Sequence, residues 1–276
     1  MKILGIYASF ILVTFSAFSK NFEGTIKWKI SMEIKSPKMK SQMEAYKKQM
    51  EDPNFRDQLK EMEAQMKDPQ MQQLFEANPQ LKAQMTKMME VSQSGDIHDM
   101  IPKEMTVKTK NQDVVLQVEG GMAKGETLFL SGKNETYLVD RKNKTYSLLQ
   151  DDDKSIEQKQ PHIKVTKTEN SKTILGFSCN HYLMEFSRQG VSVTQSVWTT
   201  TSIDGINLKP LANQKFGKQD PFFFNEKIDG IPLMVEVNTP DAEMRVEVFE
   251  IKKESLSKEI FEIPSDFVLK PLSFNY

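Results

Sequence analysis

Two side chains that can bind metals or take part in nucleophilic chemistry, Cys179 and His181, lie two residues apart. On an extended strand such residues share one face, so the thiol and the imidazole are expected to be neighbours. The pair allows a reactive thiol or a soft-metal site. A small buried residue beside a polar one gives the same pattern, and we favour that structural interpretation.

The remaining chemistry-bearing residues do not form an enzyme motif. Neither His98 nor His162 lies in a His-x-x-x-His or Glu-x-x-His spacing that would build a zinc site. The chain has no Gly-x-Ser-x-Gly elbow and no phosphate-binding Gly loop. Gly120-Gly121 is typical of a turn, and Asp151–Asp153 of a solvated loop. A catalytic pair of carboxylates that are distant in sequence and meet only in the folded chain is an alternative that the sequence leaves open. We therefore expect no catalytic residues, no cofactor and no metal, and a protein that is not an enzyme.

Methionine is concentrated in one stretch. Nine of the 17 methionines lie between Pro37 and Val91, where there is no glycine: Met39, Met43, Met50, Met62, Met66, Met71, Met85, Met88 and Met89. Thioethers bind Cu(I) and Ag(I), so a metal chaperone is one alternative. Methionine at helical spacing more often forms a core or an adaptable apolar surface, and no histidine joins this group. We favour the apolar surface.

The spacing of these methionines predicts helices. Met39, Met43, Tyr46 and Met50 step by four, three and four residues, and Phe55, Leu59, Met62 and Met66 repeat the steps, so each set lies on one helical face. Each helix start after the first is marked by Asp-Pro or Asn-Pro, in which the first residue caps the helix and proline takes the first helical position. The expected helices are 38–50, 53–66, 69–76 and 79–92.

The rest of the chain has the pattern of β-strands. Apolar residues alternate from Ile26 to Ile34, which is typical of a strand with one face in the core. Gln189-Gly190 is expected to turn a hairpin. Short strands separated by turn residues indicate a barrel or a strongly curved antiparallel sheet. Further strands are expected at 104–109, 113–119, 126–131, 135–140, 144–150, 162–169, 173–177, 179–188, 191–201, 231–238 and 243–252.

The first residues have the composition of a signal peptide. Lys2 precedes an apolar run to Phe18, and Ala17 and Ser19 are the small residues of a cleavage site. An uncleaved anchor is the alternative, but the run is shorter than the about 20 residues that span a bilayer. We expect a periplasmic or secreted protein with no transmembrane segment in its mature chain. Its parts are a signal peptide (1–19), an antiparallel β domain (20–36 and 104–276) and a Met-rich helical insertion (37–103).

Charge excludes one class of partner. The 37 basic and 38 acidic residues give a net charge of −1 and are mixed along the chain. A nucleic-acid-binding protein would show a basic face, so we expect no nucleic-acid partner. The oligomeric state stays open.

Several motifs resemble a known group of proteins. They are Lys172–Tyr182 with its Gly-Phe-x-Cys, Trp198-Thr-Thr, Gly230-Ile-Pro232, and Phe261–Phe267. Together with the first strand they resemble secreted Gram-negative proteins of unknown function, similar in outline to the lipoprotein carriers LolA and LolB and to the GLPGLI-type family. The resemblance implies an α+β fold in which a half-open barrel wraps around helices and encloses an apolar cavity. It implies no catalytic residues.

The helical insertion resembles a second group. Short Met- and Leu-rich helices that begin at Asp-Pro or Asn-Pro look like the DP-type repeats of the co-chaperones Hop and ubiquilin. That resemblance implies a groove for apolar client segments. A plain helical cover for the apolar face of the sheet is the other interpretation, since an amphipathic sheet must be covered.

Two functions follow as hypotheses. The first is an exported binding protein that holds a lipid, an acyl chain or a hydrophobic peptide between sheet and helices. The second is a client-binding chaperone or interaction module acting through the helices. Phe222–Phe224 could line the mouth of a cavity, although core packing is favoured. The expected ligand-binding residues are Met62, Met66, Met71, Leu74, Phe75, Met85 and Met88, facing Trp28 and Trp198.

Overall fold

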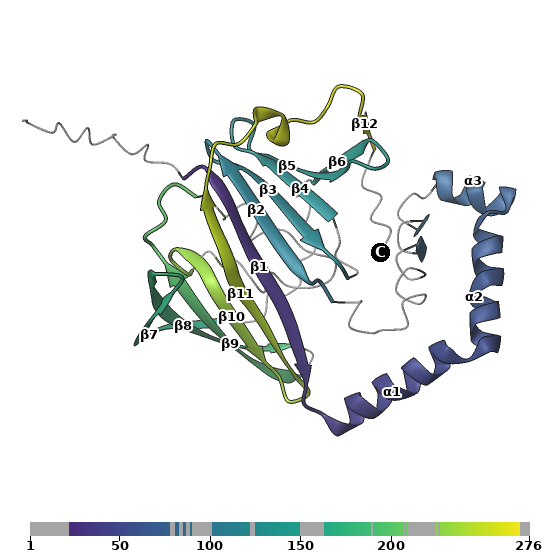
Figure 1. The fold of residues 1–276 in the computed structure, drawn as a ribbon, viewed down its shortest axis with the longest axis horizontal. Helices are drawn as coiled ribbons and strands as arrows, with labels where there is room; N and C mark the ends of the chain where they lie inside the picture. Colours follow the sequence, from purple (N-terminus) through teal and green to yellow (C-terminus); the bar gives the residue numbers. More distant parts are fainter. Residues whose placement is uncertain are drawn as a thin grey trace, which may run out of the picture.

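The structure is a computed structural model that describes residues 22–77, 81–82, 85–86, 89, 101–121, 125–149, 163–188, 190–206, 208, 225 and 227–270. Several features expected from the sequence lie outside these residues: the signal peptide, His98, His162, Asp151–Asp153, Met88 and Phe222–Phe224. Within the described parts, twelve strands form one open, curved sheet, and three helices extend from it (Figure 1).

The first half of the sheet is a meander of antiparallel strands. Asn111 and Gln112 make the tightest of its turns, since both have positive φ (53° and 71°), as a two-residue hairpin loop of type I′ requires. Each strand pairs with the next along the chain, and these contacts are local except between the first two strands, which residues 35–103 separate. Its strands are β1 (Gly24–Ile34), β2 (Glu104–Lys110), β3 (Asp113–Glu119), β4 (Gly125–Leu130), β5 (Glu135–Asp140) and β6 (Thr145–Leu149).

The second half is another meander, and the expected hairpin at Gln189-Gly190 is confirmed, because Arg188 pairs with Val191. The strand expected at 173–177 is wrong at its end, because Leu175-Gly176 form a turn. The residues before this turn form one strand, β7, in place of the two expected from 162 onward. Its pairing with β8 shifts between Lys167 and Ser171, so a three-residue bulge absorbs the polar run that suggested a break. The strands are β7 (Lys164–Ile174), β8 (Phe177–Arg188), β9 (Val191–Thr200), β10 (Ile231–Asn238) and β11 (Ala242–Lys253).

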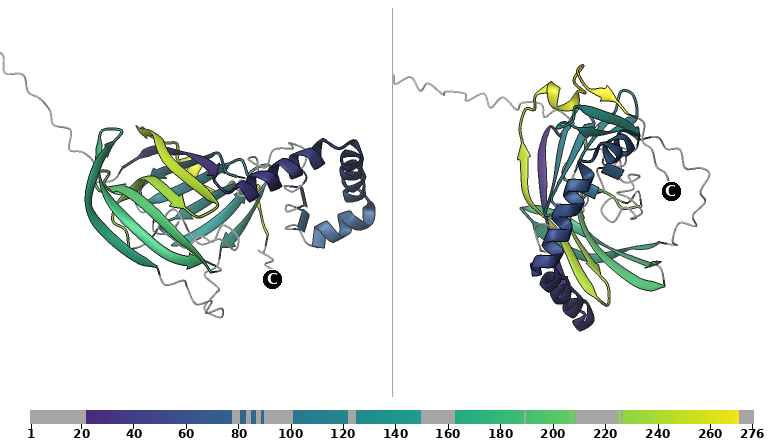
Figure 2. Two further views of the ribbon diagram at one scale, coloured as in Figure 1. Left: turned by 90° about the horizontal axis from the view of Figure 1, so that it is seen from below. Right: turned by 90° about the vertical axis from the view of Figure 1, so that its right-hand side faces the viewer.

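The two meanders join where β1 pairs with β11. The strand order is β12-β6-β5-β4-β3-β2-β1-β11-β10-β9-β8-β7, where β12 (Val268–Leu269) is a short parallel addition to β6. The β1–β11 pairing runs from Gly24–Lys253 to Ile34–Ala242. The two ends of the order do not pair with each other, so the sheet curves but does not close (Figures 1 and 2).

Apolar side chains gather on both faces of the sheet. Ile26, Val107 and Leu116 stand opposite one another on neighbouring strands and belong to the main cluster, which also takes in β8–β11 and Ile203. Val115 and Leu128 point to the other face and form a second cluster. The chain after β11 covers this second cluster with Leu256 and with Phe261, the last residue of the 3-10 helix η2 (Lys258–Phe261). The C-terminal segment therefore packs on the sheet.

Three helices follow β1 and form, with the described positions of 81–89, a helical arm: α1 (Pro37–Glu51), α2 (Pro53–Met66) and α3 (Pro69–Ala77). Ser36 and Asp52 cap the first two helices, and Asp68 Oδ1 accepts a hydrogen bond from the Gln70 amide at the third. In Figures 1 and 2, α1 leads away from the end of β1, and α2 turns and lies at the far side of the arm. No described residue of α1–α3 belongs to either apolar cluster of the sheet. The helices therefore do not form the expected cover for the sheet.

Candidate functional site

The arm has an apolar cluster of its own, which we call the arm cluster. Met66 at the end of α2, Phe75 in α3 and Met89 are its buried members, and Met71, Leu81 and Met85 pack against them. The turn at Asp68-Pro69 brings α2 and α3 together, and the Gln72 side-chain amide donates a 2.6 Å hydrogen bond to the Met66 carbonyl. The methionine spacing on successive helices thus produces a miniature core, separate from the sheet.

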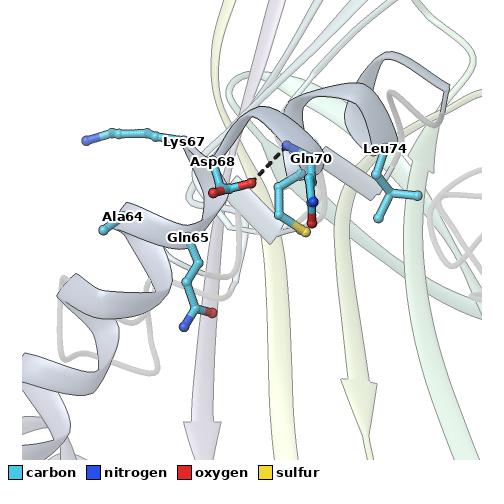
Figure 3. Close-up of a pocket in the computed structure, with 7 residues that line it drawn as sticks. Ala64, Gln65, Lys67, Asp68, Gln70 and Leu74 are labelled. Carbon is cyan, nitrogen blue, oxygen red and sulfur yellow. Dashed lines mark hydrogen bonds between the residues drawn. The ribbon is translucent and has the colours of Figure 1, made fainter.

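A shallow, open depression of about 720 Å³ lies at the corner between α2 and α3 (Figure 3). We call it the corner depression. Met62 and Leu74 on the same helices leave 40% and 47% of their surface exposed. The corner therefore combines accessible apolar surface with amide and charged side chains. Its lining residues are Ala64, Gln65, Lys67, Asp68, Gln70, Met71 and Leu74.

The structure brings only part of the predicted ligand-binding set together. Met66, Met71, Phe75 and Met85 meet in the arm cluster, and Met71 with Leu74 lines the corner depression. Trp28 and Trp198 instead belong to, or pack against, the main cluster of the sheet. They do not face the methionines, which corrects that part of the prediction. The reason is geometric: the arm leaves from the end of β1 that runs beyond its pairing with β2.

Sequence reasoning missed the polar residues of the corner depression. Gln65, Lys67 and Gln70 are polar, so they do not contribute to the apolar periodicity that predicts a binding face. Their position around Asp68-Pro69 is the usable signal, because a capped break between two helices exposes the side chains on either side of it. The thioether alternative stays a prediction; four methionines, Met66, Met71, Met85 and Met89, share the arm cluster.

The Cys179–His181 pair lies on β8, away from the arm. Cys179 is buried and its thiol contacts the Phe177 carbonyl at 3.5 Å. Burial raises the pKa of the Cys179 thiol, which keeps it protonated and a poor nucleophile. This geometry fits the structural interpretation of the pair. Among the described residues, no group of three or more His, Cys, Asp or Glu side chains is placed to hold a metal ion.

His181 is held from three sides. Its Nδ1 and Nε2 lie 2.9 Å and 2.8 Å from the hydroxyls of Thr168 and Ser196, and its ring stacks on Trp198 with centroids 4.4 Å apart. The Lys172 ammonium lies over the Trp198 ring, 4.1 Å from the ring centroid. Burial, and secondarily the positive charge of Lys172, lower the pKa of the His181 imidazole. These contacts brace the sheet around Trp198 with a neutral imidazole.

Comparisons with known proteins show the family. One family model matches residues 89–267, which leaves β1 and α1–α3 outside the match. No curated protein matches the chain. A solved structure, described as PNGF-II, is similar over 61% of this chain and 28% of its own, at 16% identity and a TM-score of 0.37, too distant to carry an argument. In the described part of this chain, no helix is long and apolar enough to cross a membrane. Because this family model matches more than half of the residues of the chain, the chain belongs to the family described as Domain of unknown function (DUF4412).

Proposed function

We propose that this protein is an exported, non-enzymatic binding protein whose helical arm holds apolar segments of other polypeptides. The observation that carries the proposal is the separation of the arm from the sheet. The arm cluster and the two clusters of the sheet share no described residue. The exposed Met62 and Leu74 are thus not part of the cover of the sheet, and Leu74 lines an open depression.

The lining of the corner depression favours a polypeptide over an acyl chain. Met71, Leu74 and Ala64 offer apolar contact, while Gln65 and Gln70 offer amide donors and acceptors. The backbone of a bound segment needs such partners once it leaves water, whereas an acyl chain has no use for them. Methionine is unbranched and repacks around different side chains, which suits a surface that accepts varied segments.

The test compares two single substitutions on α3 in the full chain. Leu74→Glu places a charge in the corner depression, whereas Gln73→Glu adds the same charge at an exposed neighbouring position outside it. Binding of a fluorescein-labelled apolar peptide is measured by anisotropy, with suppression of light scattering from an aggregating client as a second assay. Leu74→Glu is expected to weaken peptide binding about tenfold or more, since it removes one apolar anchor.

Gln73→Glu should bind as the unmodified chain does, and circular dichroism of both variants should show the same helix content. Equal affinities for the two variants would contradict the proposal. So would a chain that binds no apolar peptide at all.

A second candidate is an acyl lipid held by the sheet, as the resemblance to LolA and LolB implies. The open side of the sheet, between its end strands β12 and β7, is the observation that favours it. The fully buried Trp28, Val107 and Leu233 count against a large cavity there. Native mass spectrometry of protein purified from its own envelope separates the two candidates, because only the second expects a co-purified lipid that survives Leu74→Glu.

A further inference from the structure

The thioethers of the arm differ sharply in exposure. Met62 is 40% exposed, and Met71 is half-buried where it lines the corner depression. Met66 and Met89, in the arm cluster, are only 9% and 6% exposed. On the sheet, Met105, Met184 and Met234 are buried as well. An oxidant in solution therefore meets Met62 and Met71 before Met66 and Met89, the buried methionines of the arm cluster.

We propose that Met62 and Met71 form an oxidation site, modified by two-electron oxidants such as hydrogen peroxide, that switches off apolar binding by the arm. The modification site stands on the exposures alone. The switching effect rests on the proposed function, because Met71 lines the corner depression and Met62 is an exposed apolar side chain of α2, one of the two helices that form it.

The chemistry needs no group beyond the oxidant. The thioether sulfur attacks one peroxide oxygen, the O–O bond breaks, an S–O bond forms, and the other oxygen leaves as water after taking up a proton. Sulfur is oxidised by two electrons and the peroxide is reduced. The product, methionine sulfoxide, is polar and accepts hydrogen bonds, so an apolar segment loses its contact surface. Sulfoxide reductases reverse the step, which makes the change a switch rather than damage.

The chain offers no competing thiol. Its single cysteine, Cys179, is only 1% exposed, and this burial raises the pKa of the thiol. Peroxide reacts with thiolate rather than thiol, so this cysteine is a poor target. Oxidation of the chain is therefore expected to begin at exposed thioethers.

The experiment treats the full chain with dilute hydrogen peroxide and follows each methionine by peptide mass spectrometry. Met62 is expected to oxidise first, followed by Met71, with Met66 and Met89 last. In parallel, the affinity for the fluorescein-labelled apolar peptide should fall about tenfold or more as Met62 and Met71 are modified. Treatment with methionine sulfoxide reductases should restore it.

Two double variants provide matched controls. Leucine is close to methionine in volume and cannot form a sulfoxide, so the affinity of Met62→Leu with Met71→Leu for the peptide should be the same before and after peroxide, whatever its untreated value. Met39→Leu with Met43→Leu, on half-buried positions of α1 outside the corner depression, should stay sensitive. Equal peroxide sensitivity of the two variants overturns the switch, and oxidation of Met66 and Met89 as fast as Met62 overturns the site. If the untreated chain binds no peptide, the proposed function fails and the switch with it, while the mass spectra still decide the site.

Discussion

The indole N–H of Trp28 donates a 2.8 Å hydrogen bond to the carbonyl of Pro232, 204 residues away. Trp28 lies on β1 and Pro232 on β10, so the bond reaches across the intervening strand β11. Trp28 is fully buried in the main cluster. The contact therefore pins the junction of the two meanders from within the core.

Replacing Trp28 should weaken the whole sheet. Trp28→Phe removes the donor to Pro232 and leaves a cavity, and we expect the free energy of unfolding to fall by about 2–4 kcal/mol. Phe249→Ala is the control, because Phe249 is exposed and lies at the bulge in the β1–β11 pairing, where the change should stay within about 0.5 kcal/mol. Urea unfolding followed by circular dichroism measures both, and similar losses would refute the special role of Trp28.

Arg141 should be needed to hold Glu126 in place. Glu126 is buried on β4, and its carboxylate accepts hydrogen bonds from Arg141 Nε (2.8 Å) and Gln117 Nε2 (2.8 Å). Arg141→Met leaves this carboxylate without a counter-charge, so we expect a loss of about 1–3 kcal/mol in unfolding free energy, discounted for the partial exposure of Arg141. Lys60→Met breaks the exposed pair with Asp57 and should cost under about 0.5 kcal/mol. The result is contradicted if the two variants unfold at the same urea concentration.

His181 should make stability depend on mild acidity. Its pKa in the folded chain lies below the ordinary value of 6.5, because burial disfavours the imidazolium. A depressed folded pKa means that the unfolded chain binds the proton more readily, so the contribution of the neutral imidazole is present above pH 6.5 and is lost as pH falls through the folded pKa. Unfolding free energy should therefore drop between pH 7.5 and 5.0, and less so in His181→Gln. An identical drop in both proteins would rule out His181 as the source.

The arm should be able to open without the sheet. Phe75 is buried in the arm cluster, and Phe75→Ala removes contacts worth about 3–5 kcal/mol from a cluster of only a few residues. Hydrogen exchange should speed up about tenfold or more in α2 and α3 while the amides of β8 and β9 keep their protection. Gln73→Ala, at an exposed position of the same helix, should change neither. Faster exchange in both the arm and the sheet would show that the two are coupled.

Local patterns predicted most of the elements. The alternation from Ile26 to Ile34 is β1, and Asp52-Pro53 and Asp68-Pro69 mark the starts of α2 and α3. These signals succeed because capping and strand alternation depend on neighbouring residues. The polar run Asn170–Lys172 predicts a break in what is one strand, β7, because nothing in the run shows that the residues on either side of it pair with the same neighbour.

The placement of the arm was beyond local patterns. A methionine face looks the same whether it covers a sheet or packs on its own helices, so the spacing of Met66 and Met71 does not say where they point. Nor does Trp28 show in sequence that its partner is Pro232. Both relationships depend on the pairing of β1 with β11, which joins residues at opposite ends of the chain.

That pairing also sets the order in which the protein can fold. Most paired strands within each meander are neighbours along the chain and can form early. By contrast, β1 meets β2 only across residues 35–103 and finds its second partner only when Ala242–Lys253 is present, more than 200 residues later. Loop closure over such a distance is slow, and it makes the contact order of the sheet high. Until β11 arrives, the open edge of β1 is free to pair with other chains, so assembly of this sheet is the step most exposed to aggregation.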